Sequence, residues 1–226
     1  MKRKWYIIFF ASIVLVLIVF FNIFKYYCNY KKESIVLKSI EKEKFDTLYK
    51  INSDVVGFIE VSNTDVNYPI VKSSDNSYYL KHSFTKESSK RGAIFLDYRN
   101  DLNNLSRNNI IYGHGLVDNT MFGSLDNLVD SKNDPCYIKI ITNNSIMTFI
   151  VFSVYTIEKE GYYIKTYFSN DNYFRKFLNT IVKRSIYDFD TEVQVYDKIL
   201  TLSTCKNDFG KRIVVHAKLL KKEEIS

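Results

Sequence analysis

A succession of short apolar runs, separated by turn residues, most constrains how this chain can fold. From residue 53 onward, β-branched and aromatic runs alternate with Asn, Asp, Ser and Gly, the pattern of strands and turns. Eight strands are predicted: Val55–Val61, Tyr68–Val71, Ala93–Leu96, Asn109–Tyr112, Tyr137–Ile141, Ile146–Ile157, Lys198–Ser203 and Arg212–Leu219. Eight strands suffice to close a barrel, and closure removes the sheet edges that proline would otherwise protect. The sequence therefore predicts a mainly β fold in a chain with only two prolines.

Three stretches of the strand-rich region have helical character. Short peripheral helices are predicted over Ser74–Lys81 and Met121–Leu128, and one longer helix over Asn170–Arg184, ahead of the last two strands. The longer segment carries an apolar stripe made of Phe174, Phe177, Leu178 and Ile181.

The N-terminal quarter of the sequence has the pattern of helices instead of strands. Residues 6–24 carry no charge over 19 positions, enough for a helix to cross a hydrocarbon core of roughly 30 Å. Three basic residues at positions 2–4 predict that residues 1–5 stay in the cytoplasm and that everything after the span is extracellular. Residues 25–52 repeat apolar positions at helical spacing, which predicts an amphipathic lead-in helix. Residues 53–226 suit one extracytoplasmic domain.

A cleaved signal peptide is the alternative for residues 6–24. The apolar stretch is longer than a usual signal region, however, and no small-residue cleavage site follows it. We therefore expect a single-pass cell-membrane protein with an uncleaved N-terminal anchor.

Charge and cysteine content narrow the class further. The formal net charge of +7 falls to +4 without the residues at positions 2–4, and no basic run is interleaved with aromatics, so nucleic acid is not an expected partner. Three cysteines in an exported chain cannot all pair. Cys28 follows the apolar stretch and Cys136 opens an apolar run, so both fit as small hydrophobic residues. Cys205 remains as the candidate for chemistry.

The segment KILTLSTC is an apolar run that ends in Cys205 just before a polar loop. A strand end is a rigid platform for a nucleophile. If the alternation continues, Cys205 shares a face with Thr201 and Ser203. A buried structural cysteine is the alternative on composition alone.

Two further residues have the context of a site. His114 lies between two glycines after the run NNIIY, which leaves its imidazole accessible, whereas His216 lies inside an apolar run and His82 in a polar one. Arg212 opens the last strand seven residues after Cys205, so a hairpin returns its guanidinium toward the thiol. A thiol, a proton carrier and a permanent cation are the minimum set for acyl transfer at an amide.

These segments together resemble the sortases, membrane-anchored cysteine transpeptidases of Gram-positive bacteria, and their class B in particular. The resemblance rests on TLSTC at 201–205, RIVVHAKL at 212–219, IYGHG around the histidine and DNTMFGSL at 118–125. It extends over nearly the whole chain and includes the helix before the cysteine strand. It implies an eight-stranded closed sortase-type barrel with an N-terminal helix.

The resemblance also implies a reaction. Cys205 would attack the carbonyl after the threonine of a C-terminal sorting motif on secreted proteins and form a thioester. An amine of the peptidoglycan cross-bridge or its precursor, or a pilin lysine, would release the product. His114 would move the protons and Arg212 would stabilise the oxyanion. No cofactor is implied, and no metal is expected, because the histidines are scattered and no C-x-x-C pair occurs.

Substrate contacts are implied by the same resemblance. They would come from Asn76, Leu80, Tyr112, Tyr163, Ile164 and Ser203. The chain departs from relatives in a short loop over Lys206–Lys211, and in Asn207, where some relatives have a carboxylate. An acidic residue at Asn207 would then not be required to orient His114.

Other interpretations remain open. A papain-like protease has its cysteine before its histidine, whereas here the histidine comes first by 205 − 114 = 91 residues, and the caspase signature Q-A-C-x-G is absent. The chain could also be a membrane-tethered binding or structural protein of the wall without catalysis, or a pilin-polymerising enzyme. Labelling of Cys205 with a thiol reagent at neutral pH distinguishes the enzyme from the non-catalytic alternative, because a buried structural thiol should stay inert.

Overall fold

The computed structural model describes residues 2–225, except 131, 133–134, 159 and 206–210, and it does not describe the side chains of residues 2–14, 29–30, 32–37 and 205. The chain divides into two compact units, residues 1–41 and residues 42–226. Helix α1 (Lys2–Ile51) forms the first unit and supplies the first residues of the second. The predicted lead-in is thus helical.

The described side chains cover only part of the predicted membrane anchor. Across them, no helix combines the length and the apolar content needed to cross a membrane. The predicted span over residues 6–24 includes residues 6–14, whose side chains lie outside the description. The anchor therefore stays a prediction.

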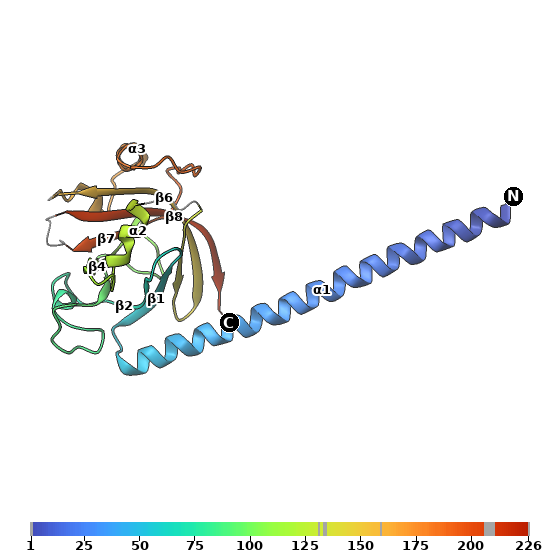
Figure 1. Cartoon of the computed structure of the whole chain (residues 1–226), viewed down its shortest axis with the longest axis horizontal. Helices are drawn as coiled ribbons and strands as arrows, with labels where there is room; N and C mark the ends of the chain where they lie inside the picture. The colour runs from blue at the N-terminus through green and yellow to red at the C-terminus, as the bar shows by residue number, and fades with distance from the viewer. Residues whose placement is uncertain (1, 131, 133–134, 159, 206–210, 226) are drawn as a thin grey trace. The chain divides into compact units, whose positions relative to one another are not determined.

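Within the described residues of the second unit, eight strands close a barrel in the order β1-β2-β3-β4-β7-β8-β6-β5 (Figure 1). This confirms the predicted mainly β class and barrel closure. Most strand bounds differ from the predicted ones by one or two residues, while β8 runs five residues further. The strands are β1 (Val55–Val61), β2 (Asn67–Val71), β3 (Ile94–Leu96), β4 (Asn108–His114), β5 (Tyr137–Ile141), β6 (Ser145–Ile157), β7 (Ile199–Cys205) and β8 (Arg212–Glu224).

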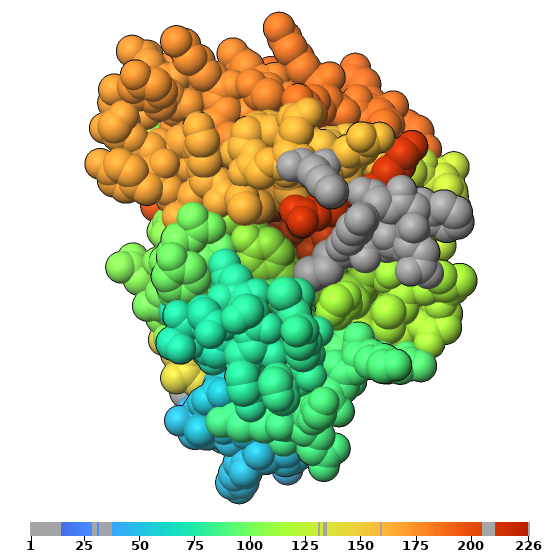
Figure 2. All heavy atoms as spheres, turned by 90° about the vertical axis from the view of Figure 1, so that its left-hand side faces the viewer, coloured from blue at the N-terminus to red at the C-terminus, as the bar shows by residue number. Residues whose placement is uncertain are grey.

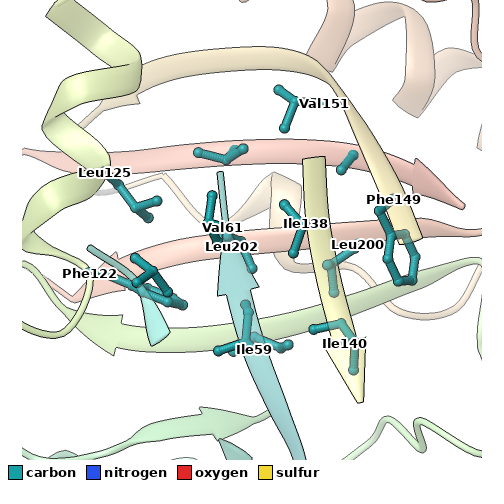
Figure 3. Close-up of a cluster of buried hydrophobic side chains, with 14 of the residues drawn as sticks. Ile59, Val61, Phe122, Leu125, Ile138, Ile140, Phe149, Val151, Leu200 and Leu202 are labelled. Atoms are coloured by element: carbon teal, nitrogen blue, oxygen red, sulfur yellow. The ribbon is translucent and has the colours of Figure 1, made fainter. Parts of the chain in front are cut away.

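Side chains that alternate inward from the strands fill the barrel. Ile59, Ile138, Phe149 and Leu200 are almost completely buried in one cluster, to which Phe122 adds from outside the strands (Figure 3). Such a core holds each strand in a single register, because a one-residue slip would turn its apolar side chains outward. The residues at the strand ends are fixed by the same packing.

Helix α3 (Asp171–Lys183) confirms the predicted longer helix and lies over the sheet next to β6 (Figure 1). The side chain of Asn170 caps its N-terminus by accepting from Tyr173 N at 3.1 Å. The predicted stripe of Phe174, Phe177, Leu178 and Ile181 is buried against Phe152, Tyr155 and Val214.

The prediction of a helix over Ser74–Lys81 is wrong in extent. The structure has a 3₁₀ turn, η1 (Tyr78–Leu80), preceded by a loop. The carboxylate of Asp75 accepts bonds from the backbone N–H groups of Ser77 and Tyr78. Such local bonds offer the backbone an alternative to the helix.

The prediction over Met121–Leu128 is wrong at its start. Met121 has a φ of +54°, which a right-handed helix cannot contain. The 3₁₀ turn η2 (Gly123–Leu125) follows, and then the short helix α2 (Asp126–Asp130). A further 3₁₀ turn, η3 (Tyr162–Ile164), comes before α3.

Candidate active site

The parallel pairing of β4 with β7 brings together the ends of two strands that are far apart in sequence. In this pair His114 lies opposite Cys205, Tyr112 opposite Ser203 and Gly113 opposite Thr204. Because parallel strands end at the same edge of a sheet, the last residue of each strand is a neighbour of the other. The backbone therefore sets the predicted histidine beside the predicted cysteine, whose side chain lies outside the description.

A pocket of about 390 Å³ opens at this edge. Its lining residues are Asn76, Leu80, Phe95, Tyr112, His114, Ile164, Ser203, Thr204 and Arg212. Figure 2 shows this side of the molecule, where red atoms of the C-terminal strands are visible between the orange segment near residues 155–185 and the teal to green segment near residues 75–95. Side chains from both flanking segments thus face the strand ends.

The imidazole of His114 is held by a backbone carbonyl. Its Nε2 lies 2.9 Å from the carbonyl oxygen of Leu80, and because a carbonyl only accepts, Nε2 carries the proton of this bond. Gly92 lies directly behind, with a φ of +61°, and a Cβ there would come within 2.9 Å of His114 Cδ2 and 3.0 Å of Leu80 O. The carbonyl of Leu80 can therefore orient His114 without a carboxylate. Asn207, the position where some relatives have a carboxylate, lies outside the described residues.

The guanidinium of Arg212 enters the pocket from the start of β8. Its Nη1 donates to the hydroxyl of Tyr163 at 3.4 Å, and that hydroxyl is 3.0 Å from Ser203 Oγ. Tyr163 and Ser203 are both buried, at 0% and 1% exposure. A packed hydroxyl pair therefore supports the cation, as expected for a group that must be oriented before a substrate arrives.

A buried carboxylate lies behind the opposite wall of the pocket. Asp97 follows β3 and accepts hydrogen bonds from Asn76 Nδ2 at 3.0 Å and from the hydroxyl of Tyr112 at 2.9 Å. Burial alone would raise the pKa of Asp97, but the bonds from Arg99 and Tyr112 outweigh it and hold the pKa below its usual value. Burial, followed by the charge of Asp97, raises the pKa of the Tyr112 phenol, which stays protonated.

The predicted site residues divide into three groups. His114, Arg212, Asn76, Leu80, Tyr112, Ile164 and Ser203 all line the pocket. Tyr163 does not line it but lies behind it. For Cys205 the strand position alone is described. The catalytic and binding roles of these residues stay predictions.

Sequence reasoning missed Asp97, Arg99 and Gly92. Asp97 is the first polar residue after the apolar run AIFL, and Gly92 is a glycine just before that run. A glycine before an apolar run and a polar residue after it both indicate the ends of a strand. Neither signal indicates which residues from distant segments will pack against Gly92 or Asp97.

Comparison with known proteins supports the geometry. The sortase domain family matches residues 59–220. Sortase B of Staphylococcus aureus is 34% identical, and the match covers 98% of each chain. The structure of a Staphylococcus aureus sortase B–substrate complex has a TM-score of 0.73 at 38% identity, covering 80% of this chain and 86% of that one. A sortase B complexed with triglycine has the same TM-score and identity, with coverages of 82% and 87%.

A closed barrel with this family match over most of its length assigns the chain to the sortase family. Within that family the relatives are of class B, and the chain is a cysteine transpeptidase of that class. The predicted family and enzyme class are thereby confirmed.

Proposed function

We propose that the pocket binds a C-terminal sorting motif, and that the chain cleaves the motif after its threonine and transfers the acyl group through a thioester to a cell-wall amine. The observation that carries this proposal is the pairing of His114 with Cys205 at the edge where Arg212 also lines the pocket. Each residue supplies a different part of an acyl transfer.

The reaction takes place in two halves. The thiolate of Cys205 attacks the threonine carbonyl, the C–N bond breaks, and His114 gives a proton to the departing amine. The incoming amine then attacks the thioester, loses a proton to His114 and releases the thiolate. In both tetrahedral intermediates the negative charge on oxygen lies near Arg212, which stays charged at any working pH.

The lining of the pocket fits an extended peptide. Leu80, Phe95 and Ile164 offer apolar contact, while Asn76, Tyr112 and Ser203 offer hydrogen bonds. This mixture is typical of small sites in which apolar walls bind and a few polar groups orient. One solved relative is a complex with its substrate, which supports a substrate-binding site on this fold.

The acceptor is proposed to be an amine of the peptidoglycan cross-bridge or its precursor. Support comes from the solved relative that holds triglycine, a peptide with a free primary amine. We also propose that residues 6–24 anchor the chain in the cell membrane, with the catalytic domain outside, since this stretch is uncharged and follows three basic residues. Resistance to alkaline extraction from membranes tests the anchor, and release of the intact chain into the wash would contradict it.

The central experiment incubates the full-length chain with a library of sorting-motif peptides, with and without triglycine, and identifies the products by mass spectrometry. We expect cleavage after threonine, a transfer product with triglycine, and an acyl-enzyme whose added mass maps to Cys205. Cys205→Ala should abolish all three. The matched control is Cys136→Ala, because Cys136 is buried in the barrel core, does not line the pocket and should not affect turnover.

The outcomes separate the alternatives. Turnover retained in Cys205→Ala would refute the nucleophile. A thiol that stays inert, with no turnover of any peptide, would favour a non-catalytic wall protein. Transfer to a lysine side chain and not to triglycine would favour pilin polymerisation instead.

A further inference from the structure

The carboxylate of Asp97 is the point at which several pocket walls meet. It is completely buried, and besides Asn76 and Tyr112 it accepts two side-chain bonds from Arg99, from Nε at 2.8 Å and from Nη2 at 2.7 Å. The backbone N–H of Arg99 adds a bond at 3.0 Å. Replacing any of these partners would leave a buried charge with fewer donors, so the arrangement is fixed in one geometry.

Arg99 carries this connection across to another segment. Its Nη2 also donates to the carbonyl oxygen of Ile164 at 3.1 Å. Ile164 ends η3 and lines the pocket on the side of α3, whereas Asn76 lies in the loop before η1 and Tyr112 lies on β4. One ion pair thus joins three walls that come from distant parts of the chain.

The hydrogen bonds also decide which groups the walls offer to a ligand. The Oδ1 of Asn76 accepts from the backbone N–H of Tyr98 at 3.0 Å, while its Nδ2 donates to Asp97. This leaves an amide N–H of Asn76 for a ligand. Because the Tyr112 hydroxyl donates its proton to Asp97, it offers a ligand its oxygen lone pairs.

We propose that Asp97 and Arg99 are positioning residues, which fix the polarity and the spacing of the acyl-donor pocket through Asn76, Tyr112 and Ile164 without touching the substrate. This inference rests on the proposed function of the pocket. It predicts that the pair acts on substrate binding rather than on the chemistry at Cys205. An amide in place of the carboxylate would keep the shape of Asp97 but would present a donor to partners that are themselves donors.

The test compares steady-state kinetics of Asp97→Asn and the unmodified full-length chain with a sorting-motif peptide. We expect KM to rise about tenfold, the effect of losing one hydrogen bond from Asn76 or Tyr112 to the substrate, while kcat changes by less than about twofold. Alkylation of Cys205 by a small thiol reagent should keep its rate. In the background of Asn76→Ala, adding Asp97→Asn should raise KM less than it does in the unmodified chain, since one of the three residues through which Asp97 acts is already gone.

The control is Asp197→Asn. Asp197 is a half-buried carboxylate that accepts from Gln194 N and pairs with Lys218, and it lies before the opposite end of β7 from Cys205. Its replacement should leave KM unchanged. If Asp97→Asn does not fold, Arg99→Lys takes its place, because lysine keeps the charge and loses the simultaneous bonds to Asp97 and Ile164.

The outcomes distinguish this inference from the function on which it rests. Turnover by the unmodified chain, with an unchanged KM in the folded Asp97 or Arg99 variant, would overturn the positioning role alone. A fall in kcat with an unchanged KM would also overturn it. No turnover by the unmodified chain would overturn the proposed function and this inference together.

Discussion

Lowering the pH from 7 to 5 should weaken the fold through one histidine, His216. This side chain is completely buried, and burial lowers its pKa from 6.5 to about 3. The unfolded chain has an ordinary histidine pKa, so between these values it binds a proton that the native state does not. The stability is therefore fully present above pH 6.5 and is lost as the pH falls toward 3.

The hydrogen bonds around His216 explain why it resists protonation. Tyr162 donates to Tyr155, whose hydroxyl is 2.9 Å from His216 Nε2, while Nδ1 is 2.8 Å from Thr201 Oγ1. Thr201 donates its own proton to Asn108 Oδ1, so it accepts from His216 and Nδ1 carries the hydrogen. A second proton on Nε2 would face a hydroxyl that is already donating, and the chain of bonds would have to reverse.

The expected loss follows from the two pKa values. With an unfolded pKa near 6.5 and a folded pKa near 3, the free energy of unfolding falls by about 2 kcal/mol between pH 7 and pH 5. Carboxylates with ordinary pKa values contribute little in this range. Urea unfolding followed by the near-ultraviolet circular dichroism of the tyrosines measures it, because the only tryptophan, Trp5, belongs to the N-terminal unit and not to the strand-rich one.

Two variants isolate the responsible group. His216→Gln should lower stability at pH 7 but flatten its dependence on pH between 7 and 5. Asn170→Ala, which removes the cap of α3 without removing a titratable group, should keep the unmodified slope. A slope that persists in His216→Gln, or an unmodified chain with equal stability at pH 7 and pH 5, would show that His216 is not the group responsible.

Arg212→Lys should lower kcat/KM about 100-fold or more with little change in stability, because an ammonium cannot reproduce the donors aimed at the oxyanion; full activity would remove Arg212 from that role. Gly92→Ala should lower the free energy of unfolding by about 1–3 kcal/mol in urea and reduce turnover, since φ is positive and a Cβ would lie 2.7 Å from Tyr79 O and press on His114; unchanged stability would show that the loop accommodates the methyl group. Asn170→Ala should cost about 1 kcal/mol through loss of the cap on α3, whereas Asn170→Asp should be nearly neutral; equal effects would exclude the capping bond.

Strand positions could be predicted because they depend on local alternation. Val55–Val61 and Tyr137–Ile141 have the predicted bounds, since both are short runs rich in β-branched and aromatic residues. The errors occur where a single side chain or backbone angle decides the conformation. Asp75 binds the backbone N–H groups that a helix would use, and Met121 has a positive φ, and composition reveals neither.

The site shows the same limit. Cys205, His114 and Arg212 could be proposed because each ends or begins an apolar run, and the family motifs include them. Asp97 could not be proposed as a support for the pocket. Its partners Asn76 and Tyr112 lie 21 residues before it and 15 residues after it, and their approach depends on how β3 and β4 pair.

The direction of the β4–β7 pair determines whether this chain has a site at all. Both strands are seven residues long, so an antiparallel arrangement would separate His114 from Cys205 by about 20 Å at 3.3 Å per residue. The parallel arrangement sets both at one edge, and the antiparallel hairpin from β7 to β8 then returns Arg212 to that edge. The backbone of Cys205, the imidazole of His114 and the guanidinium of Arg212 therefore lie at one edge, because two strands end, and a third begins, on the same side of a closed barrel. We therefore expect that replacing a residue near the opposite ends of these strands, such as Asp197 just before β7, leaves that edge undisturbed.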